Sequence, residues 1–493
     1  MIEHPVVERW GTSLLLLVVF ATRAWHADQP PLEGYVGRQI PTAMVARNLA
    51  RGSGFFHPQL DTGPFPNLFL VEPPIMAGVV ATISRLTGSP LDPTGRLVSA
   101  GSMTLAAWGI AGLVRRRSGL TASLGAVVAL ASFPISIRFG RAFQPDAMAL
   151  GLVVASARLI EGSGRWWRAI GWGLLAIGLA QKVSYVLVLL PIVGVLLAGR
   201  PRSVRWGAVL VLVPASLWYL GVAVRLAGEP VGVAASADNA ANWLARLAPT
   251  AYLDGSRWSI VGRDLLIRAF NPIASSVAVL GLAATWRDPS VRIWRLWGLG
   301  SAMALVVLFG KLHHQYYWLI MAAPIAAWAG LGIARIGEHS RPLAYAALGL
   351  LFGLGLLPPR GTWDTPEEWR GAVALAGEID RVVPEGDRLV AAEAVIYLSD
   401  RKGCRLEYEG PACRRAANEW RPADRFEGVE PADLVAFYRS FARARWFADL
   451  EPGPTDRARR DLHRAVLAMP GARRVASGPG FGLIVRFDDL PPL

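Results

Sequence analysis

The chain has 493 residues, of which 53% are hydrophobic and only 18% are charged, and its mean hydropathy is +0.35. These values exclude a disordered chain and an ordinary soluble globular protein, and they indicate an integral membrane protein. A net charge of +14 would suit a nucleic-acid partner, but residues 358–493 hold 21 basic and 22 acidic residues. The basic excess therefore lies in residues 1–357, where it sets membrane orientation, and no nucleic-acid partner is expected.

Twelve apolar runs follow one another in residues 1–357. A spanning helix needs about 20 mostly apolar residues. The second run, 73–87, is short, opens with Pro73-Pro74 and contains Arg85, so we expect it to lie in the membrane interface. The sequence thus predicts about eleven spans, near residues 10–25, 97–114, 119–137, 147–160, 168–182, 184–198, 204–226, 270–286, 293–309, 316–334 and 342–357.

Arginine clusters between these spans predict the orientation, because basic residues in short loops stay in the cytoplasm. Each cluster is separated from the next by two spans, so all of them share one side. If the N-terminus is cytoplasmic, the arginine clusters lie on the cytoplasmic side only if the run 73–87 does not cross the membrane. We therefore expect a multi-pass protein of the inner (cell) membrane with an extracytoplasmic C-terminal domain. The clusters are Arg115-Arg116-Arg117; Arg158, Arg165 and Arg168; Arg200, Arg202 and Arg205; Arg287, Arg292 and Arg295; and Arg335 and Arg341.

Residues 358–493 read as a small soluble α/β domain after a membrane domain of residues 1–357. Helical patterns cover 365–379 and 433–443, an apolar run covers 388–394, and a strand pair is expected over 474–487 around Gly478-Pro479-Gly480. The only two cysteines, Cys404 and Cys413, lie in this domain. An outer compartment would allow them to form a disulfide, and two unpaired thiols in a loop are the alternative.

The predicted outer loops carry ionisable and aromatic side chains at the ends of spans, where such groups are costly. Carboxylates, a lysine, histidines and tyrosines on one membrane surface suit group transfer from a phosphate. A carboxylate can take the proton of an incoming hydroxyl or amine, and cations and phenols can stabilise the departing phosphate. In chain order these residues are Glu33, Arg38, Asp61 and Glu72; Arg141 and Asp146; Lys182; and His313, His314, Tyr316 and Tyr317.

The order of these motifs resembles the polyprenyl-phosphate-sugar glycosyltransferases of clan C (GT-C), in particular family 39 and the bacterial aminoarabinose and lipid A core transferases. The resemblance runs from residue 10 to about 357 and more weakly beyond. Two positions depart from it: many members have an Asp-Glu pair where Leu32-Glu33 stands, and several have Lys where Pro73 stands. The matching elements are Glu33 with Arg38-Gln39 and Thr42-Ala43, Asp61 with Gly63, Glu72-Pro73-Pro74, Arg141 to Asp146, Lys182, and His314-Gln315-Tyr316-Tyr317 with Pro324.

The resemblance implies a GT-C-like polytopic helical protein that moves one sugar from a polyprenyl phosphate to a lipid, glycan or protein acceptor outside the cytoplasm, with inversion. Glu33 would be the general base, and Asp146 would bind the acceptor or orient the base. The donor phosphate would be held by Arg38, Lys182, His314, Tyr316 and Tyr317, with Asp61, Glu72, Arg141 and His313 as further site residues.

Each of these residues also has a structural explanation. Glu33 would cap a helix beginning near Gly37, and Asp146 after Pro145 suits a helix N-terminus. Lys182 would extend from a helix end to the headgroup layer, and Arg38 would contact anionic headgroups of membrane lipids. A divalent cation held by Glu72 with His313 or His314 is a further alternative, although their sequence spacing is not that of a ligand set.

The main alternative function is a transporter or flippase of lipid-linked intermediates. Transporters of this kind show internal repeats and ionisable groups near the midplane of the bilayer. No repeat is evident in this sequence, and the ionisable groups lie at the ends of spans. An acyl or phosphoryl transferase lacks its expected motif here, whereas a clan C relative that transfers whole oligosaccharides shares the same base chemistry and stays open. The sugar and the acceptor are not indicated by the sequence.

Overall fold

A computed structural model describes residues 5–63, 65–162, 164–188, 202–228, 232–247, 249–357, 359, 361–406 and 430–489. Two compact units form in it. The first contains residues 1–29, 72–221 and 241–363, and the second contains residues 30–71, 222–240 and 364–493. This division is based on contacts and differs from the predicted one. The predicted division separates a membrane part, residues 1–357, from an extracytoplasmic part, residues 358–493, and it stays a prediction.

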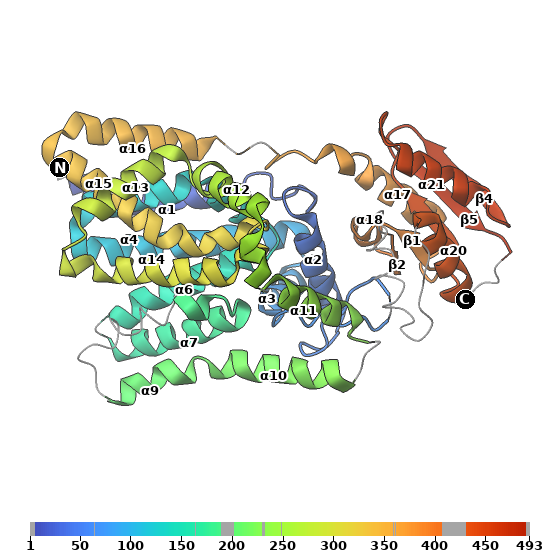
Figure 1. Cartoon of the computed structure of the whole chain (residues 1–493), viewed down its shortest axis with the longest axis horizontal. Helices are drawn as coiled ribbons and strands as arrows, with labels where there is room; N and C mark the ends of the chain where they lie inside the picture. The colour runs from blue at the N-terminus through green and yellow to red at the C-terminus, as the bar shows by residue number, and fades with distance from the viewer. Residues whose placement is uncertain are drawn as a thin grey trace. The chain divides into compact units, whose positions relative to one another are not determined.

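The first unit is a helical bundle built around one long helix (Figure 1). α4 (Leu91–Ser132) packs against α1 (Pro5–Ala24), α3 (Ile75–Thr87), α6 (Asp146–Glu161), α15 (Ala322–His339) and α16 (Arg341–Leu356). Its other elements are α5 (Pro134–Phe139), α7 (Arg165–Gln181), α9 (Arg202–Leu210), η1 (Pro249–Leu253), α12 (Gly255–Arg263), η2 (Asp264–Ala269), α13 (Pro272–Ala284), η3 (Pro289–Val291), α14 (Arg292–Val307), η4 (Phe309–Lys311) and η5 (Gln315–Met321), with α10 (Val213–Gly228) and α11 (Ala234–Arg246) belonging in part to each unit.

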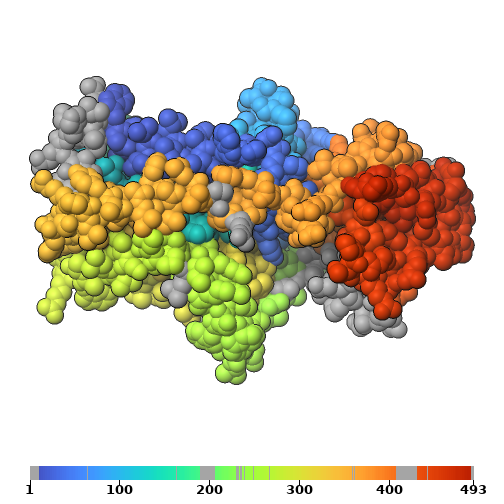
Figure 2. All heavy atoms as spheres, turned by 90° about the horizontal axis from the view of Figure 1, so that it is seen from above, coloured from blue at the N-terminus to red at the C-terminus, as the bar shows by residue number. Residues whose placement is uncertain are grey.

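Small residues allow the helices of this bundle to approach closely. A Cβ added at Gly330 of α15 would lie 2.1 Å from the carbonyl oxygen of Ala122 in α4. One added at Gly151 of α6 would lie 2.3 Å from the carbonyl oxygen of Ser102. Close backbone approach at small residues is typical of helix packing in membranes. The exposed outer side of the bundle is apolar, as on α16, which lies at the surface in Figure 2 with Leu343 and Leu350 about half exposed.

Three described helices are long and apolar enough to cross a bilayer: Leu91–Ser132, Trp206–Gly228 and Gln315–His339. The pair Gly255–Ala269 and Pro272–Ala284, bent by 96°, adds a fourth if it forms one span. Within α4, Gly119 has φ 80° and ψ −178°, so the helix breaks between the predicted runs 97–114 and 119–137. The predicted run 184–198 lies mostly outside the described residues. The expected helical fold is therefore confirmed, with at least three described helices suited to crossing a bilayer, and the number of about eleven spans stays a prediction.

The second unit contains a five-stranded mixed sheet in the order β2-β1-β3-β5-β4. β1 (Leu389–Ala391) pairs in parallel with β2 (Gly403–Arg405) and β3 (Trp446–Asp449), while β5 (Gly482–Phe487) is antiparallel to β3 and β4 (Ala472–Gly478). Helices α20 (Pro431–Phe441) and α21 (Arg457–Leu467) supply Leu434, Tyr438 and Val466 to the sheet's apolar core. The remaining elements are η6 (Glu367–Trp369), α17 (Ala372–Val382) and α18 (Glu393–Leu398). The expected small α/β fold of this part of the chain is confirmed, whereas its bounds as a domain stay a prediction.

The first predicted outer loop belongs to this second unit. Its helix α2 (Val36–Ala50) packs against α18, and Thr62 forms a parallel bridge with Gly403 of β2. The Gly63 amide donates to the Gly403 carbonyl over 2.8 Å, and the Gly403 amide donates to the Asp61 carbonyl over 3.0 Å. The loop therefore adds a short extension at the β2 edge of the sheet, which its position in the sequence did not predict.

Candidate functional site

Lys182 lies at the centre of a buried charged cluster in the first unit. It follows the last residue of α7, and its side chain is about one tenth exposed. Its Nζ is 3.1 Å from Oδ1 of Asp146 and 3.5 Å from Oε2 of Glu72. Opposite charges at these distances attract, so the two carboxylates hold the Lys182 side chain in place. The structure thus brings together residues from three predicted outer loops.

Helix ends place these three side chains. Asp146 is the first residue of α6, where the helix dipole stabilises a negative charge. Gln181, the last residue of α7, accepts a hydrogen bond from the amide of Met76 over 3.0 Å and donates to the carbonyl of Pro73 over 3.3 Å. Since Gln181 is fully buried and joins the start of α3 to the end of α7, it holds Glu72 beside Lys182.

Aromatic rings from η5 complete the cluster. Nζ of Lys182 is 5.1 Å from the ring centroid of Tyr316 and 5.7 Å from that of Tyr317, within the range of cation–π attraction. The His314 ring stacks on Tyr316 at 5.5 Å with an interplanar angle of 4°. The rings of Tyr317 and Trp243 meet edge to face at 5.9 Å. This group, Glu72, Asp146, Lys182, His314, Tyr316 and Tyr317, is called the Lys182 cluster below.

His313 lies next to this cluster but in a cationic environment of its own. It lines a small cavity together with Arg246 and Arg257. Burial first, and then the charges of Arg246, Lys311 and Arg257, lower the pKa of His313 to about 4. Burial and Arg246 lower the pKa of Lys311 to about 8, and the Lys311 ammonium lies 5.0 Å from the centroid of the Trp243 ring. A neutral imidazole among cations is a poor place for a metal ion.

The metal alternative gains no support from the part of the chain that the structure describes. No three His, Cys, Asp or Glu side chains gather there in a way that could hold a metal ion. Glu72, proposed as one ligand, is instead within ion-pair distance of Lys182.

Arg141 has contacts of a structural kind. Its fully buried guanidinium donates to the carbonyls of Trp25, His26 and Thr362 over 3.1, 2.8 and 2.5 Å, and to the Gln29 side chain over 3.2 Å. Such a pattern joins three chain segments, because each carbonyl would otherwise lack a donor. A role for Arg141 in the chemistry stays a prediction.

Glu33 and Arg38 lie in the second unit, at the start of α2. Glu33 is 2% exposed, and its carbonyl accepts a hydrogen bond of 2.6 Å from the side chain of Gln39. Tyr35, and not Glu33, occupies the N-cap position of α2. Arg38 is buried, with its guanidinium carbon 5.9 Å from the centroid of the Phe69 ring.

Asp61 also lies in the second unit, where it is part of a buried ion-pair network. Its Oδ2 accepts from Nε and Nη2 of Arg47 over 3.2 and 2.6 Å, and its Oδ1 accepts from Asn48 over 3.1 Å. Arg47 also lies 3.0 Å from Asp400 and donates to the carbonyl of Tyr397 over 2.6 Å. These contacts tie α2 to α18, so the structure gives Asp61 a structural role that its motif did not reveal.

Comparison with known proteins places this geometry in a fold class. The family model described as dolichyl-phosphate-mannose-protein mannosyltransferase matches residues 71–226. The structure of ArnT from Cupriavidus metallidurans bound to undecaprenyl phosphate superposes with a TM-score of 0.63 at 14% identity, over 98% of both chains. The fold is that of the clan C glycosyltransferases. The resemblance seen in the sequence is confirmed.

Two further clan C structures are similar. The Archaeoglobus fulgidus oligosaccharyltransferase, in complex with Zn and sulfate, matches with a TM-score of 0.58 at 12% identity, over 97% of this chain and 73% of that one. The mycobacterial arabinofuranosyltransferase AftD matches with a TM-score of 0.54 at 14% identity, over 97% of this chain and 41% of that one. A search of curated protein sequences gave no match. The enzyme class expected from the motifs therefore agrees with every structure compared.

The structure adds two residues, Gln181 and Trp243, to the predicted set of site residues. Gln181 stood next to Lys182 in the sequence, but its hydrogen bonds to α3 depend on a segment more than 100 residues away. Trp243 lies in a long loop whose only signal was its aromatic content. Its contacts with Lys311 and Tyr317 follow from the packing of α11 against η4 and η5.

Proposed function

We propose that this clan C protein transfers a single sugar from a polyprenyl phosphate donor to an extracytoplasmic acceptor, with inversion at the anomeric carbon. The observation that carries the proposal is the Lys182 cluster. One buried ammonium, two carboxylates and two tyrosines from four outer loops meet on a fold whose compared members include ArnT bound to undecaprenyl phosphate. The proposed membrane is the inner membrane, with the N-terminus in the cytoplasm.

In the proposed reaction the acceptor oxygen or nitrogen attacks the anomeric carbon from the face opposite the phosphate. The bond from the anomeric carbon to the phosphate oxygen breaks, and its electron pair leaves with the polyprenyl phosphate. The acceptor's proton passes to a carboxylate, which contributes about 10² to 10⁴ in rate when it is well placed. On the resemblance in sequence alone, Glu33 is this base and Asp146 binds the acceptor or orients the base.

Lys182 is the proposed main cation for the donor phosphate. Several family members carry a lysine where Pro73 stands, and this chain lacks it. The Lys182 ammonium lies 3.5 Å from the carboxylate of the adjacent Glu72, so it supplies a positive charge next to that position. A departing phosphate would compete with Asp146 and Glu72 for this ammonium. The hydrogen bond between the ammonium and the phosphate would be charge-assisted and therefore strong. Arg38, His314, Tyr316 and Tyr317 are the further proposed phosphate ligands.

The test is transfer of radiolabelled monosaccharide from a panel of polyprenyl phosphate donors by the purified full chain. Wild type is compared with Glu33→Gln and Asp146→Asn, which remove a charge and keep the shape. Glu368→Gln, at an exposed position, is the matched control. We expect turnover in wild type and in the control, a loss of at least 10²-fold in Glu33→Gln, and a smaller loss in Asp146→Asn.

Each outcome of this assay decides between functions. Wild-type turnover that survives in Glu33→Gln would reject the first-loop base while keeping the transferase. Folded protein that releases no sugar from any donor would reject the transferase and favour the flippase alternative, for which lipid translocation in liposomes is the assay.

A further inference from the structure

A second charged cavity in the first unit lies outside the Lys182 cluster. It has a volume of about 550 Å³, within the range of 300 to 1,000 Å³ typical of small-molecule sites. Four elements line it: α5, η2, η5 and the end of α16. All four lie where predicted spans end on the outer face, at the level of the lipid headgroups. The lining residues are Pro134, Arg138, Ile267, Arg268, Gln315, Leu354, Leu357 and Pro359.

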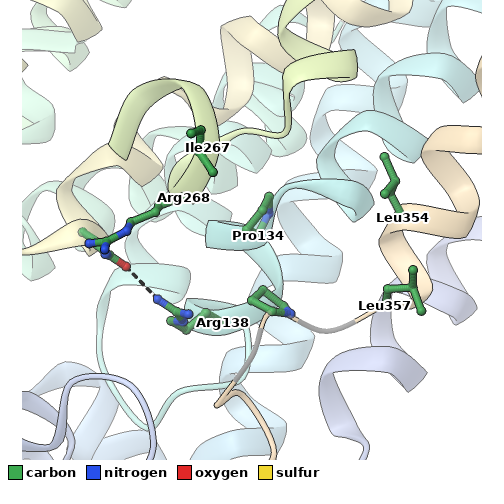
Figure 3. Close-up of a pocket in the computed structure, with 8 residues that line it drawn as sticks. Pro134, Arg138, Ile267, Arg268, Leu354 and Leu357 are labelled. Atoms are coloured by element: carbon green, nitrogen blue, oxygen red, sulfur yellow. Dashed lines mark hydrogen bonds between the residues drawn. The ribbon is translucent and has the colours of Figure 1, made fainter. Parts of the chain in front are cut away.

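The lining has a charged side and an apolar side. Figure 3 shows Arg138 and Arg268 at one side, and Leu354 of α16 and Leu357 just after that helix at the other. The Arg138 guanidinium donates to Oε1 of Gln315, another lining residue, over 2.7 Å. Leu357 is 67% exposed, so the apolar side opens outward. This pattern matches an amphiphile with an anionic head and an apolar chain.

The local charge is positive. Oδ1 of Asp264 lies 3.4 Å from Arg268 of η2 and 3.9 Å from Arg263, the last residue of α12. Among the residues that the structure describes, the three arginines Arg138, Arg263 and Arg268 act on this one carboxylate. Arginine presents a planar fork of donors that suits phosphate, and arginines at the headgroup layer attract anionic lipids.

The cavity adjoins the Lys182 cluster through two pairs of neighbouring residues. Arg138 bonds to Gln315 on the cavity side, while the next residues in each segment, Phe139 and Tyr316, meet edge to face at 6.0 Å. A ligand held by Arg138 would thus act on η5, the element that carries Tyr316 of the cluster.

We propose that this cavity binds a lipid whose headgroup is a phosphate, with Arg138 and Arg268 at the head and Ile267, Leu354 and Leu357 along the chain. The site is distinct from the phosphate ligands proposed for the sugar donor. The proposal does not depend on the transferase activity, because it concerns binding alone.

The experiment measures lipid binding to the full chain in detergent by native mass spectrometry. The probes are phosphatidic acid and diacylglycerol with the same acyl chains, so that only the phosphate differs. We expect phosphatidic acid to bind and diacylglycerol not to. Arg138→Gln and Arg268→Gln should each weaken phosphatidic acid about tenfold, the loss of one charge-assisted bond, whereas Arg263→Gln, next to the cavity but not in its lining, should change it less than twofold.

Two arms identify the chemistry and source of the ligand. Leu357→Ser should weaken phosphatidic acid severalfold and leave inorganic phosphate unaffected, since it removes only apolar burial. Displacement of phosphatidic acid by undecaprenyl phosphate, with the same sensitivity to Arg268→Gln, would identify a polyprenyl carrier; its absence would identify a bilayer phospholipid. Equal binding of diacylglycerol, equal effects of Arg268→Gln and Arg263→Gln, or a Leu357→Ser variant that binds phosphatidic acid as wild type does would overturn the proposal.

Discussion

Replacing Lys182 with methionine tests the cluster most directly. Methionine keeps the length and flexibility of the side chain and removes its charge. The ammonium is about nine tenths buried and lies 3.1 Å from Asp146 and 3.5 Å from Glu72. Removing it leaves two largely buried carboxylates facing each other, and breaking such a pair costs on the order of 3–5 kcal/mol of folding free energy. The 3.5 Å contact is the weaker of the two, so we expect a value near the lower end.

The same substitution should also reduce sugar transfer. A charge-assisted hydrogen bond to phosphate contributes about 1.5–3 kcal/mol, so kcat/KM should fall by roughly 10- to 150-fold beyond any loss of folded protein. The folded fraction is measured by thermal unfolding in detergent, and transfer is measured per folded molecule. Lys402→Met, at an exposed position, is the matched control and should change neither quantity.

A second variant separates the folding role from the phosphate role. Adding Glu72→Gln to Lys182→Met removes one of the two stranded charges, so stability should recover in part while transfer stays low. Wild-type transfer per folded molecule in Lys182→Met would refute the assignment of Lys182 to the donor phosphate. Recovery of transfer in parallel with stability would show that Lys182 acts only on the fold.

Three further predictions follow from other parts of the molecule. Asp61→Asn removes the charge that Arg47 binds and should destabilise the second unit by about 1.5–3 kcal/mol. Limited proteolysis measures this loss, with Asp364→Asn at an exposed position as the control. Equal resistance of the two variants to the protease would contradict the ion-pair network. The pKa of His313 is lowered from 6.5 to about 4 in the folded protein, so between these pH values the unfolded chain binds more protons than the folded one. The free energy of unfolding should therefore rise with pH from about 4 to 6.5. His313→Gln should flatten that rise, whereas the control His339→Gln, at an exposed position, should not. Cys404 is fully buried and burial raises the pKa of its thiol to about 12, so iodoacetamide should not alkylate it in the folded protein; modification of Cys404 mapped by mass spectrometry before unfolding would disprove its burial. Cys413, its expected disulfide partner, lies outside the described residues.

Local pattern predicted the elements well, because it depends on neighbours in the chain. Alternating and apolar runs over 388–394 and 474–487 became strands β1, β4 and β5, and the helical pattern at 433–443 became α20, two residues earlier at each end. The two apolar runs 97–114 and 119–137 became the two parts of α4, which breaks at Gly119. The partners of a buried arginine are a different matter. Arg141 binds carbonyls more than 100 positions before it and more than 200 after it, and no periodicity encodes that.

Motif and topology together predicted half of the candidate site. Glu72, Asp146, Lys182, Tyr316 and Tyr317 were expected on one face and do meet. Asp61 satisfied the same family pattern, yet Arg47 and Asn48 occupy both of its oxygens. A buried carboxylate in a functional site and a buried carboxylate in a structural ion pair look alike in sequence, because both are acidic residues beside polar neighbours. Only the identity of the facing side chain separates them.

The contacts of Lys182 bear on the membrane topology as well as on the chemistry. Lys182 lies within ion-pair distance of both Glu72 and Asp146, so the chain between any two of these residues must cross the bilayer an even number of times. Two predicted spans separate Asp146 from Lys182, which is even. Three apolar runs separate Glu72 from Asp146, so one of them does not cross. The run 73–87 forms α3, a helix of 13 residues that is about 20 Å long at 1.5 Å per residue, whereas the hydrocarbon core is about 30 Å thick. The side-chain contacts therefore favour the same interfacial segment as the arginine clusters do, from independent evidence.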